Sequence, residues 1–338
     1  MSGKLNPQKR NKLIDDILRE LRQGRTFFMA GHEKPDGDTI GSELAMDSLL
    51  RRFGKRSIDI YNRQPVPRYL QFMPNCRRIK TAQRVSKTYD VAIIFECSNQ
   101  DRMGNIIDLK KQARRVINID HHSIHTDFGH INMIDPSASS TSELIFHVFD
   151  RARYRLTLTE ATCLYVGLVT DTGRFQQDNT TPDSHAVAVR LLEAKIPVAD
   201  ISRNLYGTAP VSAIRLLGIA LSSLRLAERD RVAILTLRRA DFARAGSSDE
   251  ETEGIINQGL KIPSVVVSIL VREMSSGRIK VSLRSKNSFN VNEIVRSFNG
   301  GGHRHAAGCT LSGSIETVTQ TVLRSLSAAF RTHSASAR

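Results

Sequence analysis

Three short runs of apolar residues in the N-terminal part of the chain each lead directly into polar residues of the kinds that bind metals. The runs lie at 26–30, 91–95 and 116–119, and helical patterns alternate with them. Buried strands that alternate with helices are typical of a parallel sheet covered by helices on both faces. Ligands of such sheets bind at the carboxyl ends of the strands. The pattern therefore predicts an α/β domain with its site at one edge of the sheet.

A weakly patterned segment at 196–215 is expected to link this domain, residues 1–195, to a second one at 216–331. A chain of 338 residues is long enough for two domains. The second is predicted to be a smaller α/β domain, with the active cleft between the two. Its strands are expected at 232–237, 265–271 and 279–284, and its helices at 249–259, 290–298 and 314–330.

The composition excludes several classes of protein. Hydrophobic residues make up 40% of the chain, too many for a disordered protein, and no apolar stretch is long enough to span a membrane. The N-terminus lacks the apolar block of a signal peptide, and the four cysteines form no CxxC pair or disulfide framework. We therefore expect a soluble cytoplasmic protein with no membrane partner. The sequence leaves a homodimer open.

The net charge of +15 favours contact with a polyanion such as nucleic acid. The chain has 49 Lys and Arg residues against 34 Asp and Glu residues, and such an excess attracts anions and speeds their encounter. The same excess could serve solubility, so the charge alone leaves both interpretations open.

The loop after the first apolar run, residues 31–42, carries one imidazole and two carboxylates. These groups belong to His32, Asp36 and Asp38, and they could aim at a common metal ion. The alternative is a solvated turn in which Asp38 or Thr39 caps the following helix.

Two further groups of metal-ligand type come from later in the chain. His121 and His122 follow Asp120 at the end of the third apolar run, and Asp171 follows the apolar run at 164–169. Hydrogen-bonded loop residues and a polar helix end are the alternative interpretations.

Together these residues suit a pair of Mn²⁺ or Mg²⁺ ions better than a structural zinc. They form a mixed His and Asp set without Cys, whereas structural zinc sites prefer thiolates. Two divalent ions about 3.5–4 Å apart are a common arrangement for attack on phosphorus. Such a pair needs a bridging carboxylate, and Glu96 stands at the end of the middle run.

A glycine run near the C-terminus could bind an anion. Gly300, Gly301 and Gly302 would let backbone N–H groups approach a phosphate closely. His303 adds a donor, and Arg284 lies near the end of the preceding strand. A glycine-rich hairpin with exposed basic residues is the alternative.

The sequence resembles the DHH phosphoesterases that carry a DHH-associated C-terminal domain. Their motifs occur in the right order and spacing over about residues 20–330, as GHEKPDGDTIGS, NIDHH, LVTDTGRF, SLRS and GGGHRHAAG. The chain length and the two-domain layout are similar to those of the oligoribonuclease and pAp phosphatase type within the family.

The resemblance implies a two-manganese site in the first domain, with Mg²⁺ as the other candidate ion. His32 and Asp36 would bind one ion, and Asp38, His121 and Asp171 would bind the other.

The same resemblance implies catalytic and substrate-binding roles. His122 would lie against the scissile phosphate as a stabiliser and proton donor, and Asp171 would be essential for turnover. The second domain would hold the far end of the substrate through Arg284, the backbone of residues 300–302 and His303.

The chain departs from the family pattern at the middle strand, where the family has a bridging Asp and this sequence has Glu96. The extra methylene moves the carboxylate by about a bond length, and a misplacement of about 1 Å can cost roughly a hundredfold in rate. Either the site has adjusted around Glu96, or its activity is reduced. We favour adjustment because every other ligand position is intact.

The leading hypothesis is a metal-dependent hydrolase of very short RNA or DNA oligonucleotides that releases nucleoside monophosphates and could also convert pAp to AMP. Cleavage of cyclic dinucleotides or of single-stranded DNA is the first alternative. The second is a nucleic-acid-binding protein with an impaired metal site, which Glu96 and the basic charge suggest.

Overall fold

The structure is a computed structural model, and it describes residues 5–252, 254–286 and 289–336. The chain divides into two compact units, Met1–Thr208 and Ala209–Arg338, and each is described by itself. The segment 196–215, which the sequence predicts to be a linker, contains the helix α7 (Val198–Ser202) and the first residues of the helix α8 (Val211–Ser222).

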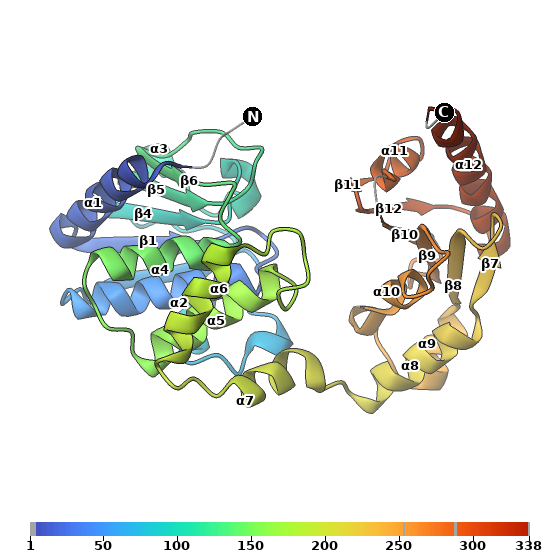
Figure 1. Cartoon of the computed structure of the whole chain (residues 1–338), viewed down its shortest axis with the longest axis horizontal. Helices are drawn as coiled ribbons and strands as arrows, with labels where there is room; N and C mark the ends of the chain where they lie inside the picture. The colour runs from blue at the N-terminus through green and yellow to red at the C-terminus, as the bar shows by residue number, and fades with distance from the viewer. Residues whose placement is uncertain (1–4, 253, 287–288, 337–338) are drawn as a thin grey trace. The chain divides into compact units, whose positions relative to one another are not determined.

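The first unit is built on a six-stranded sheet in which all neighbouring strands are parallel, in the order β3-β2-β1-β4-β5-β6 (Figure 1). The three predicted apolar runs form the adjacent strands β1, β4 and β5, which confirms the parallel sheet. The other strands lie further out and are short or partly exposed, so they lack a continuous apolar run. The strands are β1 (Thr26–Ala30), β2 (Ser57–Asn62), β3 (Ile79–Thr81), β4 (Tyr89–Phe95), β5 (Ala113–Asp120) and β6 (Ile131–Ile134).

Helices cover both faces of this sheet, as the sequence predicts. Phe27 and Met29 of β1 pack in the core beneath α1, α2, α4 and α5, whereas Phe28 and Ala30 pack with residues of η3 and α3 on the other face. The segment that connects β4 to β5 supplies two short helices to the second face. The helices and helical turns are α1 (Pro7–Gln23), α2 (Gly37–Arg52), η1 (Arg68–Leu70), η2 (Cys76–Arg78), η3 (Gln100–Met103), α3 (Leu109–Gln112), α4 (Thr141–Arg151), α5 (Leu158–Asp171), α6 (Pro182–Leu192), α7 and the π-helical turn η4 (Arg203–Gly207).

Two glycines let the helices around the site approach one another closely. A Cβ atom on Gly41 of α2 would lie 2.4 Å from the carbonyl oxygen of Cys163 in α5. A Cβ atom on Gly167 of α5 would lie 1.9 Å from Ser142 Oγ and 2.7 Å from Asp38 Oδ1. Both distances are too short for a side chain, so α2, α4 and α5 meet at positions where only glycine fits.

The second unit contains a mixed six-stranded sheet in the order β11-β12-β10-β9-β8-β7, in which only β8 and β9 pair in parallel. The predicted strands at 232–237, 265–271 and 279–284 are β8, β9 and β10. Residues of α11 and α12 pack on one face, and residues of α8, α9 and α10 pack on the other. The elements are α8, β7 (Arg225–Ala227), β8 (Val232–Leu237), α9 (Arg239–Ala245), η5 (Asp249–Thr252), α10 (Ile255–Leu260), β9 (Val267–Glu273), β10 (Ile279–Ser285), α11 (Val291–Arg296), β11 (Gly301–His303), β12 (Ala306–Leu311) and α12 (Ile315–Ser336).

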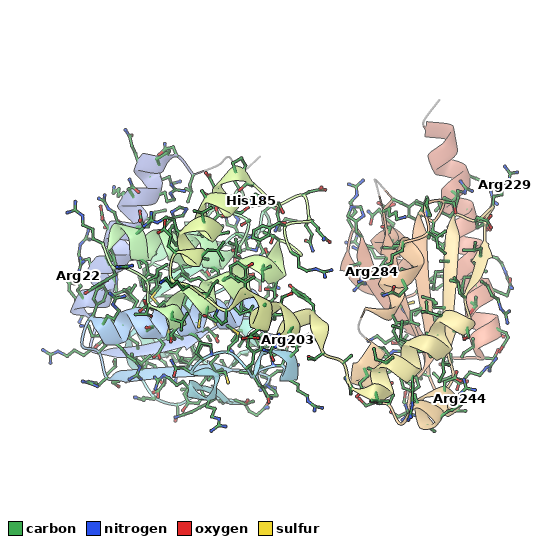
Figure 2. The ribbon with its side chains drawn as sticks, turned by 60° about the horizontal axis from the view of Figure 1, so that its bottom comes forward. Arg22, His185, Arg203, Arg229, Arg244 and Arg284 are labelled. Carbon is green, nitrogen blue, oxygen red and sulfur yellow. The ribbon has the colours of Figure 1, made fainter. Side chains whose placement is uncertain are left out.

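Basic side chains project from the surface of both units. Figure 2 labels Arg22 and Arg203 on the first unit and Arg229 and Arg244 on the second, and all four are exposed. Within the described residues, no single helix is long and apolar enough to cross a membrane. The helix pair Val198–Gly207 and Val211–Ser222, which is bent by 55°, has the length and composition of a membrane span only when the two helices are taken together.

Candidate metal centre

The first unit gathers its candidate ligands at the carboxyl ends of three neighbouring strands. His32 and the start of α2 follow β1, Glu96 follows β4, and His121 follows β5. Asp171 joins them as the last residue of α5. The structure therefore brings residues that are distant in the sequence to the predicted edge of the sheet.

Two groups of side chains have ligand atoms close enough to share a metal ion. Asp38, His121 and Asp171 form one group, and Glu96, His121 and His122 form the other, with the ligand atoms of each group within 4.8 Å of one another. His121 belongs to both. Its Nε2 atom lies 3.4 Å from Asp171 Oδ2 and 3.6 Å from Glu96 Oε1.

His32 and Asp36 lie together at the start of α2, with His32 Nε2 3.6 Å from Asp36 Oδ2. Among the described residues, they belong to neither of the two groups. Asp36 caps α2, since its Oδ1 accepts a hydrogen bond of 3.0 Å from the Thr39 amide. The alternative interpretation of this loop, with Asp38 or Thr39 as the cap of a solvated turn, is therefore wrong, because Asp38 lies inside the helix and is 1% exposed.

The N-terminus of α4 holds the Asp38 carboxylate. The backbone amides of Thr141 and Ser142 donate to its two oxygens at 2.6 and 2.8 Å. The positive end of a helix stabilises a negative charge placed there. Sequence reasoning missed this contact, although the Ser140 and Glu143 spacing is a signal for a helix start at this point.

Glu96 is buried and held in an uncommon backbone conformation. Its φ angle is +57°, its exposure is 2%, and the hydroxyl of Thr141 donates to its Oε1. A positive φ in a residue with a long side chain is uncommon and often occurs at functional sites. Burial, together with the negative charge of Asp38, raises the pKa of Glu96 well above its usual value.

The two ring nitrogens of His121 face different partners. Its Nδ1 lies 3.3 Å from the carbonyl oxygen of Ala138, which favours a proton on Nδ1 and leaves Nε2 to face the carboxylates. Burial works against a charged imidazole, but the contact with Glu96 and the charge of Asp171 raise the pKa of His121 to about 11. Burial and the nearby Asp38 also raise the pKa of Asp171 to about 7.

The raised pKa values of these acidic groups reflect the cost of gathering negative charge in a buried place. The carboxylates of Asp38 and Asp171 lie in one group and that of Glu96 lies beside the same histidine, and burial together with the charge of Asp38 raises the pKa of both Glu96 and Asp171. A divalent cation would neutralise this charge, and imidazole with carboxylate ligands is a donor set that such ions accept. The residues therefore fit a divalent metal.

His122 is oriented by a buried aspartate. His122 Nδ1 lies 2.6 Å from Oδ1 of Asp120, and its Nε2 lies 3.2 Å from Nη1 of Arg102. Burial opposes the charged form of Asp120, but its hydrogen bond with His122 still lowers its pKa. Sequence reasoning assigned no individual role to Asp120, although an aspartate directly before two histidines at a strand end is a signal for one.

Asn179 is a second residue that sequence reasoning missed. Its Nδ2 lies 2.9 Å from the Ser139 carbonyl oxygen and 3.2 Å from both the carbonyl oxygen and Oδ2 of Asp171. It thereby ties the end of α5 to the segment before α4. Asn179 and residues 176–178 also line an open pocket of about 570 Å³ together with His121, His122 and Asp171.

The residues predicted to bind the far end of a substrate lie in the second unit. Arg284 lies in β10 and is labelled in Figure 2. Gly300 and Gly302 are needed for close backbone packing, since a Cβ atom on them would lie 2.5 Å from the carbonyl oxygens of Gly308 and Ala306 respectively.

The other two predicted substrate residues lie in the short strand β11. A Cβ atom on Gly301 would meet open space, so packing does not require glycine at this position. His303 ends the strand, and its side chain lies outside the described part of the structure. The role of this region in substrate binding stays a prediction.

Comparisons with known proteins agree with this architecture. Residues 26–168 match the DHH family, N-terminal domain, and residues 230–331 match the DHHA1 domain. The bifunctional oligoribonuclease and PAP phosphatase NrnA of Thermus thermophilus is 30% identical over 302 residues, which cover 89% of this chain and 88% of the relative.

Two solved structures share the fold. An exopolyphosphatase-related protein from Bacteroides fragilis has a TM-score of 0.87 at 29% identity, covering 94% of this chain and 96% of that one. RecJ from Thermus thermophilus, solved in complex with Mn²⁺, has a TM-score of 0.52 at 13% identity, covering 97% of this chain and 55% of that one. At this identity, the RecJ likeness shows the fold alone.

The chain belongs to the DHH family of phosphoesterases, which are hydrolases, and it carries a DHHA1 domain after its DHH domain. This confirms the resemblance seen in the sequence. Within the family, it is similar to proteins of the NrnA type.

Proposed function

We propose that this protein uses divalent metal ions to hydrolyse short oligoribonucleotides and pAp. The observation that carries the proposal is the convergence of Asp38, His121 and Asp171, with Glu96 beside them, at one edge of the sheet. The name of the Thermus thermophilus relative, an oligoribonuclease and PAP phosphatase, supports both substrates.

The proposed metal ligands are the residues that the sequence indicates. His32 and Asp36 would hold one ion, Asp38, His121 and Asp171 would hold a second, and Glu96 would bridge them. Bound ions of this kind stabilise negative charge on a phosphate and make water a better nucleophile. Manganese is the ion that we favour, because it accepts both the imidazole and the carboxylate ligands of this set.

His122 and Arg102 are proposed to contact the scissile phosphate. Asp120 accepts a hydrogen bond from His122 Nδ1 and so fixes the orientation of the ring. The other ring nitrogen is then directed toward Arg102, whose guanidinium group is suited to bind phosphate oxygens. If Arg102 moves from Nε2 to the phosphate and His122 is protonated on both ring nitrogens, His122 would stabilise charge on the phosphate and donate its Nε2 proton to the leaving oxygen.

The second unit is proposed to bind the rest of the substrate. Arg284, the backbone of residues 300–302 and His303 would contact a phosphate or the terminal nucleoside, and the net charge of +15 would draw the anionic substrate to the protein. A compact second unit that binds the far end of the substrate would favour short substrates over long strands. Cytoplasmic location and a homodimer stay predictions from the sequence.

The direct test is hydrolysis by the purified protein. We expect release of AMP from the 5′-phosphorylated dinucleotide pApA and from pAp in the presence of Mn²⁺, with no release in EDTA. The absence of product from both substrates would contradict the proposal. Salt-dependent binding of long RNA without metal-dependent turnover would instead identify a nucleic-acid-binding protein.

A further inference from the structure

We propose that Thr141 is a positioning residue that fixes the Glu96 carboxylate within the metal centre. The inference rests on the proposed function, because it assumes that Glu96 serves the metal site. The Thr141 hydroxyl belongs to α4, whereas Glu96 follows β4.

The first observation concerns the position of Glu96. Its side chain is buried directly after β4, and its carboxylate reaches His121 at 3.6 Å and His122 at 3.9 Å. A glutamate has one more rotatable bond than an aspartate, so its carboxylate needs an additional contact to stay in one orientation. The Thr141 hydroxyl supplies that contact by donating to Oε1.

The second observation concerns the helix that carries Thr141. The same residue donates its backbone amide to Asp38 at 2.6 Å and its hydroxyl to Glu96. The first turn of α4 therefore holds two carboxylates, one from the first turn of α2 and one from the residue directly after β4. It sets the distance between these carboxylates before any ion is bound.

The contact with Asp38 uses the backbone amide of Thr141 and the contact with Glu96 uses its side chain, so a substitution can remove one and keep the other. Any residue except proline would keep the amide that binds Asp38, but only serine or threonine would keep the hydroxyl that binds Glu96. A β-branched side chain such as threonine also has restricted χ1 rotation, which holds the hydroxyl in place. Thr141→Val therefore removes the Glu96 contact while preserving the shape and the Asp38 contact.

Residues that hydrogen-bond to metal ligands and orient them affect how tightly the metal binds. Loss of such a partner costs about 10- to 100-fold in metal affinity or activity. We expect Thr141→Val to weaken Mn²⁺ binding by about that factor, as measured by calorimetric titration, and Thr141→Ser to retain most of the affinity.

The decisive experiment combines Thr141→Val with Glu96→Asp. The shorter aspartate side chain would no longer reach the hydroxyl, so Thr141→Val should change Mn²⁺ affinity much less in the Glu96→Asp background than in the native one. Equal losses in both backgrounds would show that Thr141 acts only through the helix, and they would overturn the inference. An unchanged affinity in the Thr141→Val single variant would also overturn it.

Ser48→Ala is the matched control. It removes a hydroxyl that donates to the buried Glu160 at 2.8 Å, away from the metal centre. This variant should lose thermal stability without losing Mn²⁺ affinity.

If Thr141→Val does not fold, the pair Thr141→Ser and Thr141→Ala gives the same comparison. If the native protein itself binds no Mn²⁺, the proposed function fails; if it binds Mn²⁺ and only the Thr141 prediction fails, the proposed function stands.

Discussion

The carboxyl edge of the first sheet and the β11 region of the second unit hold their candidate residues in different ways. In the first, Asp38 and Glu96 are 1% and 2% exposed and are anchored by donors from α4. In the second, Gly301 and Gly302 lie in β11 at the edge of the sheet, and both are exposed. An edge strand presents one row of backbone groups to its open side.

The difference agrees with the proposed division, in which the first region carries out the chemistry and the second binds the substrate. Buried charges with fixed partners are organised before a ligand arrives, which is the arrangement that lowers the cost of charge development in a reaction. An exposed edge can accept a substrate without such preparation. Substitutions in the first region should therefore change metal binding and kcat, and substitutions in the second should change KM.

The largest effect is expected from Asp171→Asn. This change removes a charge from the group of Asp38, His121 and Asp171 with little change in volume. We expect kcat to fall by more than about 100-fold, beyond the loss caused by removing an outer partner of a metal ligand. Steady-state kinetics on pApA would measure the loss, and retained turnover would show that Asp171 is not part of the active centre.

The next largest effect is expected at Asn179, which donates to Oδ2 of Asp171 at 3.2 Å. Asn179→Ala should weaken Mn²⁺ binding by about 10- to 100-fold. Asn179→Asp should be at least as damaging, since it replaces a donor with a second negative charge at the same place. Calorimetric titration separates these variants, and native affinity in Asn179→Asp would contradict the role of the amide.

The affinity for Mn²⁺ should depend on pH, because His121 and Asp171 have raised pKa values. The pKa of His121 is raised to about 11 and that of Asp171 to about 7, so both groups hold protons in the metal-free protein at pH 6. A bound cation must displace such protons, so Mn²⁺ affinity should rise with pH, by about tenfold per unit for each proton released. Titrations in buffers of different ionisation enthalpy would detect the release, and an affinity that does not depend on pH would count against this ligand set.

The smallest effect is expected in the second unit. Arg284→Ala should raise KM for pApA by about five- to tenfold, the equivalent of one ordinary hydrogen bond, while kcat and Mn²⁺ affinity stay close to native. A loss of kcat instead of an increase in KM would remove the proposed division between the two regions.

The sequence predicted the central part of the first unit because buried parallel strands are recognisable without any partner. The runs that became β1, β4 and β5 are almost entirely apolar, and the candidate ligands follow their ends. β2, β3 and β6 were missed because they are short or have exposed positions, so their sequences resemble loops.

The contacts that orient the ligands could not be predicted in the same way. Thr141 meets Glu96 across 45 positions of sequence, and Asp38 meets Ser142 across 104. Such pairs depend on how α4 packs against α2 and α5, which local patterns do not encode. The glycines at 41 and 167 were uninformative for the same reason, because their importance depends on atoms of other helices.

The position of α4 has a consequence for variation elsewhere in the first unit. Its first turn anchors Asp38 and Glu96, while its later residues, such as Leu144 and Phe149, are completely buried in the core. A core substitution that moves this helix would displace both carboxylates together. Hydrophobic residues that never touch an ion can therefore govern how well the protein retains one, and the evolution of its interior is tied to the evolution of its chemistry.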